Sequence, residues 1–174
     1  AAANSATVQK TKLIMGFGYD NAQLKELRHP TKEDLDKVST EYPVLIVHQS
    51  GHLGGLNTKA LEMVKFNAQS KDPQGGVIQR KPGTQEPNGV VEELAFFMAM
   101  GNLVGDLGTA GFRALVKAGT ELWASFGYTT AQEGRSSAAV DKAIADLGAS
   151  GELLIDVVSY PDVLADREHI LKSR

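Results

Sequence analysis

The second half of the chain alternates amphipathic helices with short apolar strands, and this pattern limits the fold more than any other feature. The sequence predicts a helix over residues 109–126, a strand over 128–132, a helix begun by Ser136 or Ser137, a strand over 153–158 and a final short helix. The first helix has one apolar face and ends before Gly127, a residue type common just after helices. Strands joined by crossover helices pair in parallel, so the sequence indicates the α/β class.

The length of 174 residues restricts how such a pattern can be completed. It is typical of one domain, and we expect residues 1–174 to form a single domain with a flexible or irregular start over 1–12. A closed (β/α)₈ barrel takes roughly 250 residues. Only three or four segments look like barrel strands, so a barrel built by this chain would be incomplete.

The first half of the chain is predicted to contain a strand over residues 13–20. Residues 43–48 follow and are the best candidate for a buried strand. A glycine-rich loop over 49–55 follows, and Asn57 is suited to begin the next helix. Thr31 and Asp34 have the spacing of a helix-capping pair. A loop or hairpin over 72–88 carries a short strand at 77–80.

Composition excludes several classes of site. The net charge of −3 argues against a nucleic-acid surface, which needs a basic patch. The absence of cysteine excludes disulfides, thiolate metal sites and a cysteine nucleophile. No apolar run approaches the ~20 residues of a membrane span. We therefore expect no nucleic-acid or membrane partner and a soluble protein, with the cytoplasm favoured and the compartment not determined.

Four histidines could carry chemistry. His29 and His169 lie in charged stretches typical of solvated surface, and His48 ends an apolar strand, where a hydrogen-bonded core histidine is the commoner outcome. His52 follows the best strand in a glycine-rich loop, the position where parallel α/β folds place active sites. It is either a functional residue or a loop histidine bonded to backbone.

Standard catalytic motifs are missing. The chain has no His-x-His, no His-Glu-x-x-His, no Gly-x-Ser-x-Gly and no phosphate-binding glycine loop. Glu92 and Glu93 are adjacent and therefore point in different directions. Residue types alone favour two surface carboxylates, although one of them could face a site.

Several ordered segments nevertheless resemble one branch of the amidohydrolase superfamily, amidohydrolase family 3, which includes N-substituted formamide deformylases and exoenzyme-regulator-like proteins. They cover about residues 13–158, and their order and spacing carry the resemblance. In sequence they are Gly-Phe-Gly-Tyr-Asp at 16–20, Arg-His-Pro-Thr at 28–31, Ser-Gly-His at 50–52, Asn-Thr-Lys-Ala-Leu at 57–61, Gly-Val-Val-Glu-Glu at 89–93 and Gly-Tyr-Thr-Thr-Ala-Gln-Glu at 127–133.

The resemblance implies a (β/α)₈ (TIM) barrel of the metal-dependent hydrolase type, with zinc or another divalent metal at its mouth. The metal would activate water for hydrolysis of a non-peptide C–N bond in a small amide-type substrate. In such enzymes a His-x-His pair lies upstream of the first matching segment, and later histidines and an aspartate lie downstream of the last. We therefore expect this chain to be an internal fragment of a larger amidohydrolase that is inactive, and binds no stoichiometric metal, by itself.

Matching motif by motif assigns roles to four residues. His52 matches a histidine of the family's pocket and is the candidate catalytic residue, and Glu93 matches the glutamate expected beside the metal. Asp20 and Glu133 match polar pocket positions and are candidate substrate-binding residues. This chain has Ser50 where the family often has Asp, which leaves any role of that acid open.

Two other readings remain. The chain could be a stand-alone binding or self-association module descended from such an enzyme, forming a homodimer through an exposed sheet edge. It could also be a complete small enzyme that uses His52 and Glu93, although two groups are fewer than the three protein ligands of a catalytic zinc.

Overall fold

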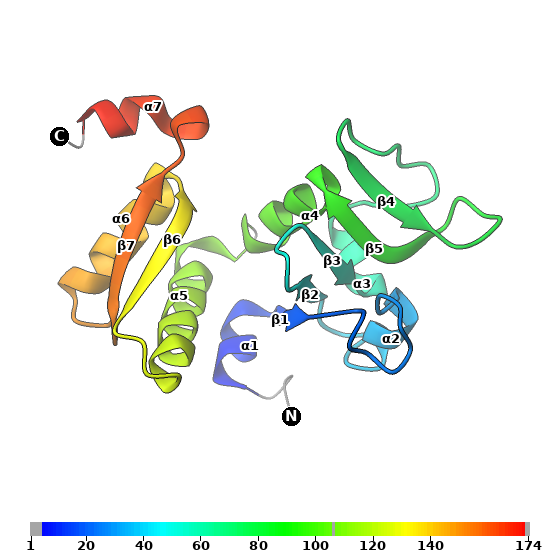
Figure 1. Cartoon of the computed structure of the whole chain (residues 1–174), viewed down its shortest axis with the longest axis horizontal. Helices are drawn as coiled ribbons and strands as arrows, with labels where there is room; N and C mark the ends of the chain where they lie inside the picture. The colour runs from blue at the N-terminus through cyan, green and yellow to red at the C-terminus, as the bar shows by residue number, and fades with distance from the viewer. Residues whose placement is uncertain (1–4, 106, 173–174) are drawn as a thin grey trace. The chain divides into compact units, whose positions relative to one another are not determined.

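The computed structural model describes residues 5–105 and 107–172, without the side chains at 164–166 and 169. The chain divides into two compact units, Ala1–Gly108 and Thr109–Arg174, where we expected a single domain. Each unit has its own sheet (Figure 1). No helix of the described residues is long and apolar enough to cross a membrane.

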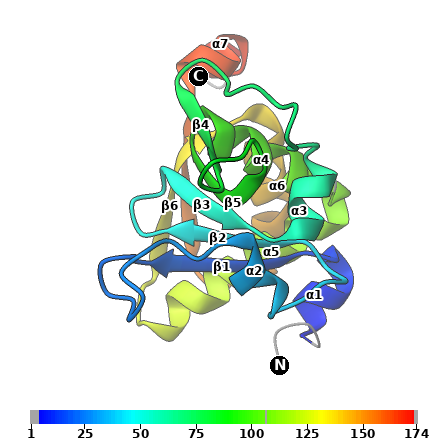
Figure 2. The ribbon, with the colours of Figure 1, turned by 90° about the vertical axis from the view of Figure 1, so that its right-hand side faces the viewer.

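Unit 1 is built around a five-stranded mixed sheet with the strand order β1-β2-β3-β5-β4 (Figure 2). Its elements are α1 (Ala6–Thr11), β1 (Ile14–Tyr19), α2 (Lys32–Asp36), β2 (Val44–His48), β3 (Leu53–Leu56), α3 (Thr58–Met63), β4 (Gly76–Arg80), β5 (Pro87–Glu93) and α4 (Leu94–Gly105). Strands β1 and β2 are parallel, and the other pairs are antiparallel.

Alternation along β2 divides the core of unit 1 into two layers. Leu45 and Val47 pack in a cluster that includes residues of α3 and α4, while Val44 packs on the other face with Val8 of α1 and Leu35 of α2. Successive strand residues point to opposite faces, so helices cover both sides of the sheet. The predicted strands at 13–20, 43–48 and 77–80 are confirmed as β1, β2 and β4.

Two expectations for unit 1 are corrected. The irregular start expected over 1–12 contains α1, because the side chain of Ser5 caps its first turn by accepting from the N–H of Val8 at 3.1 Å; residues 1–4 lie outside the described part. The loop expected over 49–55 contains β3, which makes a hairpin with β2. His52 therefore lies in the short connection between β2 and β3, directly after the turn that Gly51 N–H closes on the His48 carbonyl, and not in a loop that leads into a crossover helix.

Unit 2 follows the predicted alternation. It comprises α5 (Gly108–Ser125), β6 (Thr130–Ser136), α6 (Ala138–Ala149), β7 (Asp156–Pro161) and α7 (Val163–Lys172). Strands β6 and β7 are parallel, as expected, and are joined through α6, which is capped by Ser137, one of the two serines that the sequence offered. Ala143, Ile144 and Leu147 of α6 are buried, whereas Val158 and Tyr160 on β7 are about half exposed. The βα alternation is thus a property of unit 2, while unit 1 is a mixed sheet.

Candidate functional site

His52 and Glu93 meet although they lie 41 positions apart in the sequence. His52 Nδ1 lies 3.1 Å from Glu93 Oε2, and the backbone N–H of Glu93 donates to the carbonyl of His52 at 2.7 Å. Antiparallel pairing of β3 with β5, in register Leu53↔Glu92, brings the two together. The pair joins the turn before β3 to the junction between β5 and α4.

The backbone at Glu93 and the packing of His52 orient the two side chains. Glu93 is a non-glycine residue with φ +49°, a left-handed conformation that L residues rarely adopt. The ring of His52 stands edge-on to Phe97 of α4, with 6.1 Å between ring centroids. Residues in sparsely populated backbone conformations are concentrated at functional sites, and this one belongs to the pair that the sequence singled out.

The pair is open to solvent and does little for stability. The side chains of His52 and Glu93 are 61% and 55% exposed. An exposed ion pair contributes about 0–1 kcal/mol to stability. A stabilising role therefore does not explain the pair. A carboxylate hydrogen-bonded to an imidazole can orient the ring for proton transfer, and its second oxygen can ligate a cation.

A second cluster lies where the parallel strands β1 and β2 end. The rings of Tyr19, His29 and His48 pack edge to face, with centroids 5.2–5.9 Å apart. Tyr19 Oη lies 3.0 Å from His29 Nδ1. Burial raises the pKa of Tyr19 to about 12, with a further contribution from the charge of Glu92. Burial, and next the neighbouring His48, lower the pKa of His29.

Asp20 borders this cluster. Its carboxylate accepts the backbone N–H of Ala22 and the side-chain amides of Gln23 and Gln49, each at 2.9 Å. These bonds, led by the one from Ala22, lower the pKa of the Asp20 carboxyl. Asp20 Oδ1 also lies 4.0 Å from His48 Nε2. The carboxylate therefore links the segment after β1 to the segment after β2.

Glu133 lies on β6 in unit 2. Its Oε1 accepts the backbone N–H of Arg135 at 3.0 Å. It borders a groove between α5 and the β6–β7 sheet, lined mainly by apolar side chains such as Phe112, Val116 and Val157. His169 lies outside the described side chains.

The described residues contain no complete metal site. No three His, Cys, Asp or Glu side chains among them are arranged to hold an ion. His52 and Glu93 offer one imidazole nitrogen and one carboxylate, donor types that zinc accepts. A catalytic zinc takes three protein ligands, so these residues cannot complete such a site by themselves.

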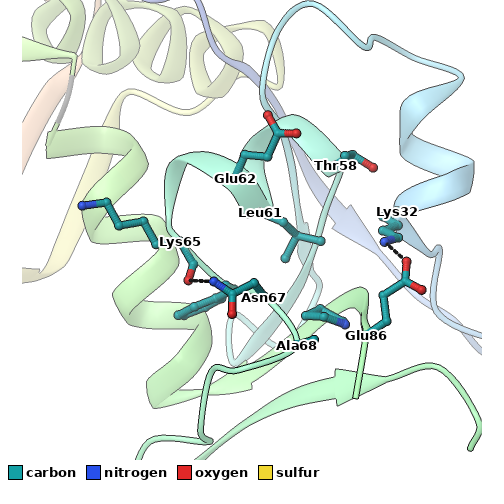
Figure 3. A pocket seen from close by; sticks show the side chains of 10 residues that line it. Lys32, Thr58, Leu61, Glu62, Lys65, Asn67, Ala68 and Glu86 are labelled. Carbon is teal, nitrogen blue, oxygen red and sulfur yellow. Dashed lines mark hydrogen bonds and ion pairs between the residues drawn. The ribbon is translucent and has the colours of Figure 1, made fainter. Parts of the chain in front are cut away.

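A pocket of about 420 Å³ lies elsewhere in unit 1, between α3 and the start of β5 (Figure 3). Leu61, Phe66 and Pro87 give it apolar walls. At its edge Lys32 Nζ contacts Glu86 Oε1 at 2.5 Å. This ion pair engages Lys32 and Glu86 with each other, and we assign the pocket no chemistry.

Comparison with known proteins identifies the family. The sequence profile described as "Amidohydrolase family" matches residues 1–173. The chain belongs to the amidohydrolase family. It is 32% identical over 82 residues to an N-substituted formamide deformylase of Arthrobacter pascens, a match that covers 47% of this chain and 15% of that protein. It is 31% identical over 86 residues to the protein named as amidohydrolase YtcJ in Bacillus subtilis (strain 168), covering 49% and 16%.

The fold comparison agrees with that family. The crystal structure of an uncharacterized metal-dependent hydrolase from Pyrococcus furiosus superposes with a TM-score of 0.52 at 22% identity, covering 86% of this chain and 29% of that one. At this identity the likeness concerns the fold. The chain thus spans under a third of its structural neighbour and about a sixth of its curated relatives. The expected family, the α/β class and the partial coverage of a metal-dependent hydrolase fold are confirmed.

Proposed function

We propose that this chain is the middle segment of a metal-dependent amidohydrolase that hydrolyses a non-peptide C–N bond in a small amide-type substrate. The observation that carries the proposal is the convergence of His52 and Glu93, with Glu93 in a left-handed conformation, in a chain of the amidohydrolase family. Among its relatives is a protein named for deformylation of N-substituted formamides.

In this proposal Glu93 is the carboxylate beside the metal and His52 is a catalytic residue of the pocket. A divalent ion held beside Glu93, with zinc as the favoured identity, would lower the pKa of a bound water towards ~7 and would polarise the scissile carbonyl. The bond to Glu93 fixes the orientation of the His52 imidazole, so that its other nitrogen is directed away from the carboxylate. Asp20 and Glu133 are the proposed substrate-binding residues, in a TIM barrel that this chain builds only in part.

The test is hydrolysis by the longer protein that we propose contains this segment. A His52→Ala change removes a general acid or base, an effect worth about 10²–10⁴-fold in rate, so turnover falls on that scale while the protein stays folded. Retained turnover would remove His52 from the mechanism. The reading frame before Ala1 should encode the His-x-His that the family places there, and the 174-residue chain alone should be inactive.

A self-association module is the second candidate, and one observation favours it. Val158 and Tyr160 of β7 are 45% and 50% exposed, on a two-stranded sheet whose edges could pair with another copy. Analytical ultracentrifugation at several concentrations tests it: a dimer of the 174-residue chain supports the module, and a monomer at all concentrations rejects it. The cytoplasm is the proposed compartment in either case.

A further inference from the structure

The turn that presents His52 is held by hydrogen bonds centred on His48, the last residue of β2. Ser50 N–H donates to His48 Nδ1 at 3.1 Å, and the hydroxyl of Ser50 lies 2.9 Å from the same nitrogen. The N–H of His52 in turn donates to Ser50 Oγ at 3.3 Å. The turn closes with a bond of 2.9 Å from Gly51 N–H to the carbonyl of His48.

This arrangement determines the chemical state of His48. A nitrogen that faces the Ser50 N–H must act as an acceptor, so the neutral ring carries its proton on Nε2. Nε2 is buried and has no hydrogen-bond partner among the described residues, and it faces Asp20 Oδ1 at 4.0 Å. With Nδ1 facing Ser50, the Nε2–H of His48 is directed towards the Asp20 carboxylate.

Packing prevents the ring from turning. The side chain of His48 is only 12% exposed. Its ring stands edge to face against Tyr19 and His29, with centroids 5.2 and 5.8 Å away. Asp20 is fixed independently through its bonds to Gln23 and Gln49. His48 is thus a rigid acceptor beneath a turn whose own residues are exposed.

We propose that His48 is a positioning residue, whose Nδ1 holds, through Ser50, the turn that presents His52 to Glu93. The inference rests on the proposed function, because His52 matters to a reaction only if that function is right. Ser50 and Gly51 are exposed, so water would replace the lost bonds if His48 were absent. Loss of the acceptor should therefore loosen the turn more than it destabilises the unit.

Two matched variants separate this role from ring packing. In His48→Asn the side-chain carbonyl can reach the position of Nδ1 and keep an acceptor there, whereas in His48→Gln the amide lies at the position of Nε2. Both variants lose the ring. We expect the Ser50 and His52 amide resonances of the ¹⁵N-labelled chain to stay near their wild-type positions in His48→Asn and to move in His48→Gln. Amide exchange at both residues should be about tenfold faster in His48→Gln, the effect of losing one hydrogen bond.

The same variants are then assayed for hydrolysis in the longer protein that we propose contains this segment. His48→Gln should lower kcat with little change in KM, and His48→Asn should restore most of the loss. Identical behaviour of the two variants, or unmoved Ser50 and His52 amides in His48→Gln, would overturn the inference. If His48→Gln moves these amides while His52→Ala keeps full turnover, the positioning stands and the proposed function fails.

Discussion

At Glu93 the backbone conformation favours glycine for stability, whereas the candidate function needs a glutamate side chain. An L residue in the left-handed region costs roughly 1–2 kcal/mol, which glycine avoids. The Glu93 side chain does not offset this cost in stability, since its ion pair with His52 is exposed. A glutamate in this position is therefore better explained by what its carboxylate does than by stability.

The first prediction follows from this conflict. Glu93→Gly should be more stable than Glu93→Ala by about 1 kcal/mol, because both lose the carboxylate and only glycine relieves the backbone. Urea unfolding of the two variants measures the difference. Equal stabilities would show that the φ of +49° is not a strained feature of the folded chain.

The sequence could name His52 and Glu93 but not their contact. Both residues were identified from motifs, whereas the 3.1 Å approach depends on the register Leu53↔Glu92 between strands far apart in sequence. The left-handed conformation of Glu93 also has no local signal, since glutamate is not a residue that favours it. The role of His48 was likewise hidden, because an end-of-strand histidine is typical of a satisfied core residue.

At the scale of elements, one buried amide fixes the start of α3. Asn57 is fully buried, and its Oδ1 accepts from Val44 N–H at 2.9 Å and from Ala60 N–H at 2.8 Å. Its Nδ2 donates to the carbonyls of Ser39 and Tyr42 at 2.7 and 3.0 Å. One side chain therefore caps the helix and ties it to β2 and to the segment before β2.

Asn57→Ala should destabilise unit 1 by about 3 kcal/mol or more, because it leaves several buried donors and acceptors without partners. Asn67→Ala is the control, since Asn67 is exposed and its replacement should change stability by about 0.5 kcal/mol at most. Thermal or urea unfolding compares them. A loss below 1 kcal/mol for Asn57→Ala would contradict the bonding described.

Strand β3 shows what the sequence could not reveal at this scale. Its Gly54 and Gly55 disfavour a strand by propensity. The fold requires the first of them, since a Cβ at Gly54 would lie 2.6 Å from the Ile46 carbonyl oxygen and 2.9 Å from the Phe96 ring. By contrast, the capping residues of α2, α3 and α6 are local signals and were predicted correctly.

An ion network between α2 and the β4–β5 hairpin gives a pH prediction. Lys32 and next Lys81 bind the Glu86 carboxylate at 2.5 and 2.8 Å and lower its pKa to about 2, from an ordinary value near 4.5. A carboxyl with a lowered folded pKa contributes stability above its unfolded pKa, and this is lost as the pH falls. Stability should therefore decline between pH 4.5 and 2, and less steeply in Glu86→Gln. Parallel pH profiles for the two proteins would contradict the network.

At the scale of the whole molecule, the two units differ in how much their sequence revealed. The helix–strand periodicity predicted unit 2 element by element, because βα units are built from local signals. Unit 1 depends on long-range antiparallel pairing, such as that of β3 with β5, which periodicity does not specify. The division into two units was not predicted, since length alone fits a single domain.

The most direct test is the metal content of the longer hydrolase in two adjacent variants, Glu93→Gln and Glu92→Gln. Glu92 lies on the same strand, and its Oε1 accepts from Gln79 Nε2 at 2.6 Å. Elemental analysis should find divalent metal retained in Glu92→Gln and lost or strongly reduced in Glu93→Gln. Full metal content in Glu93→Gln, or stoichiometric zinc tightly bound by the 174-residue chain alone, would contradict the account.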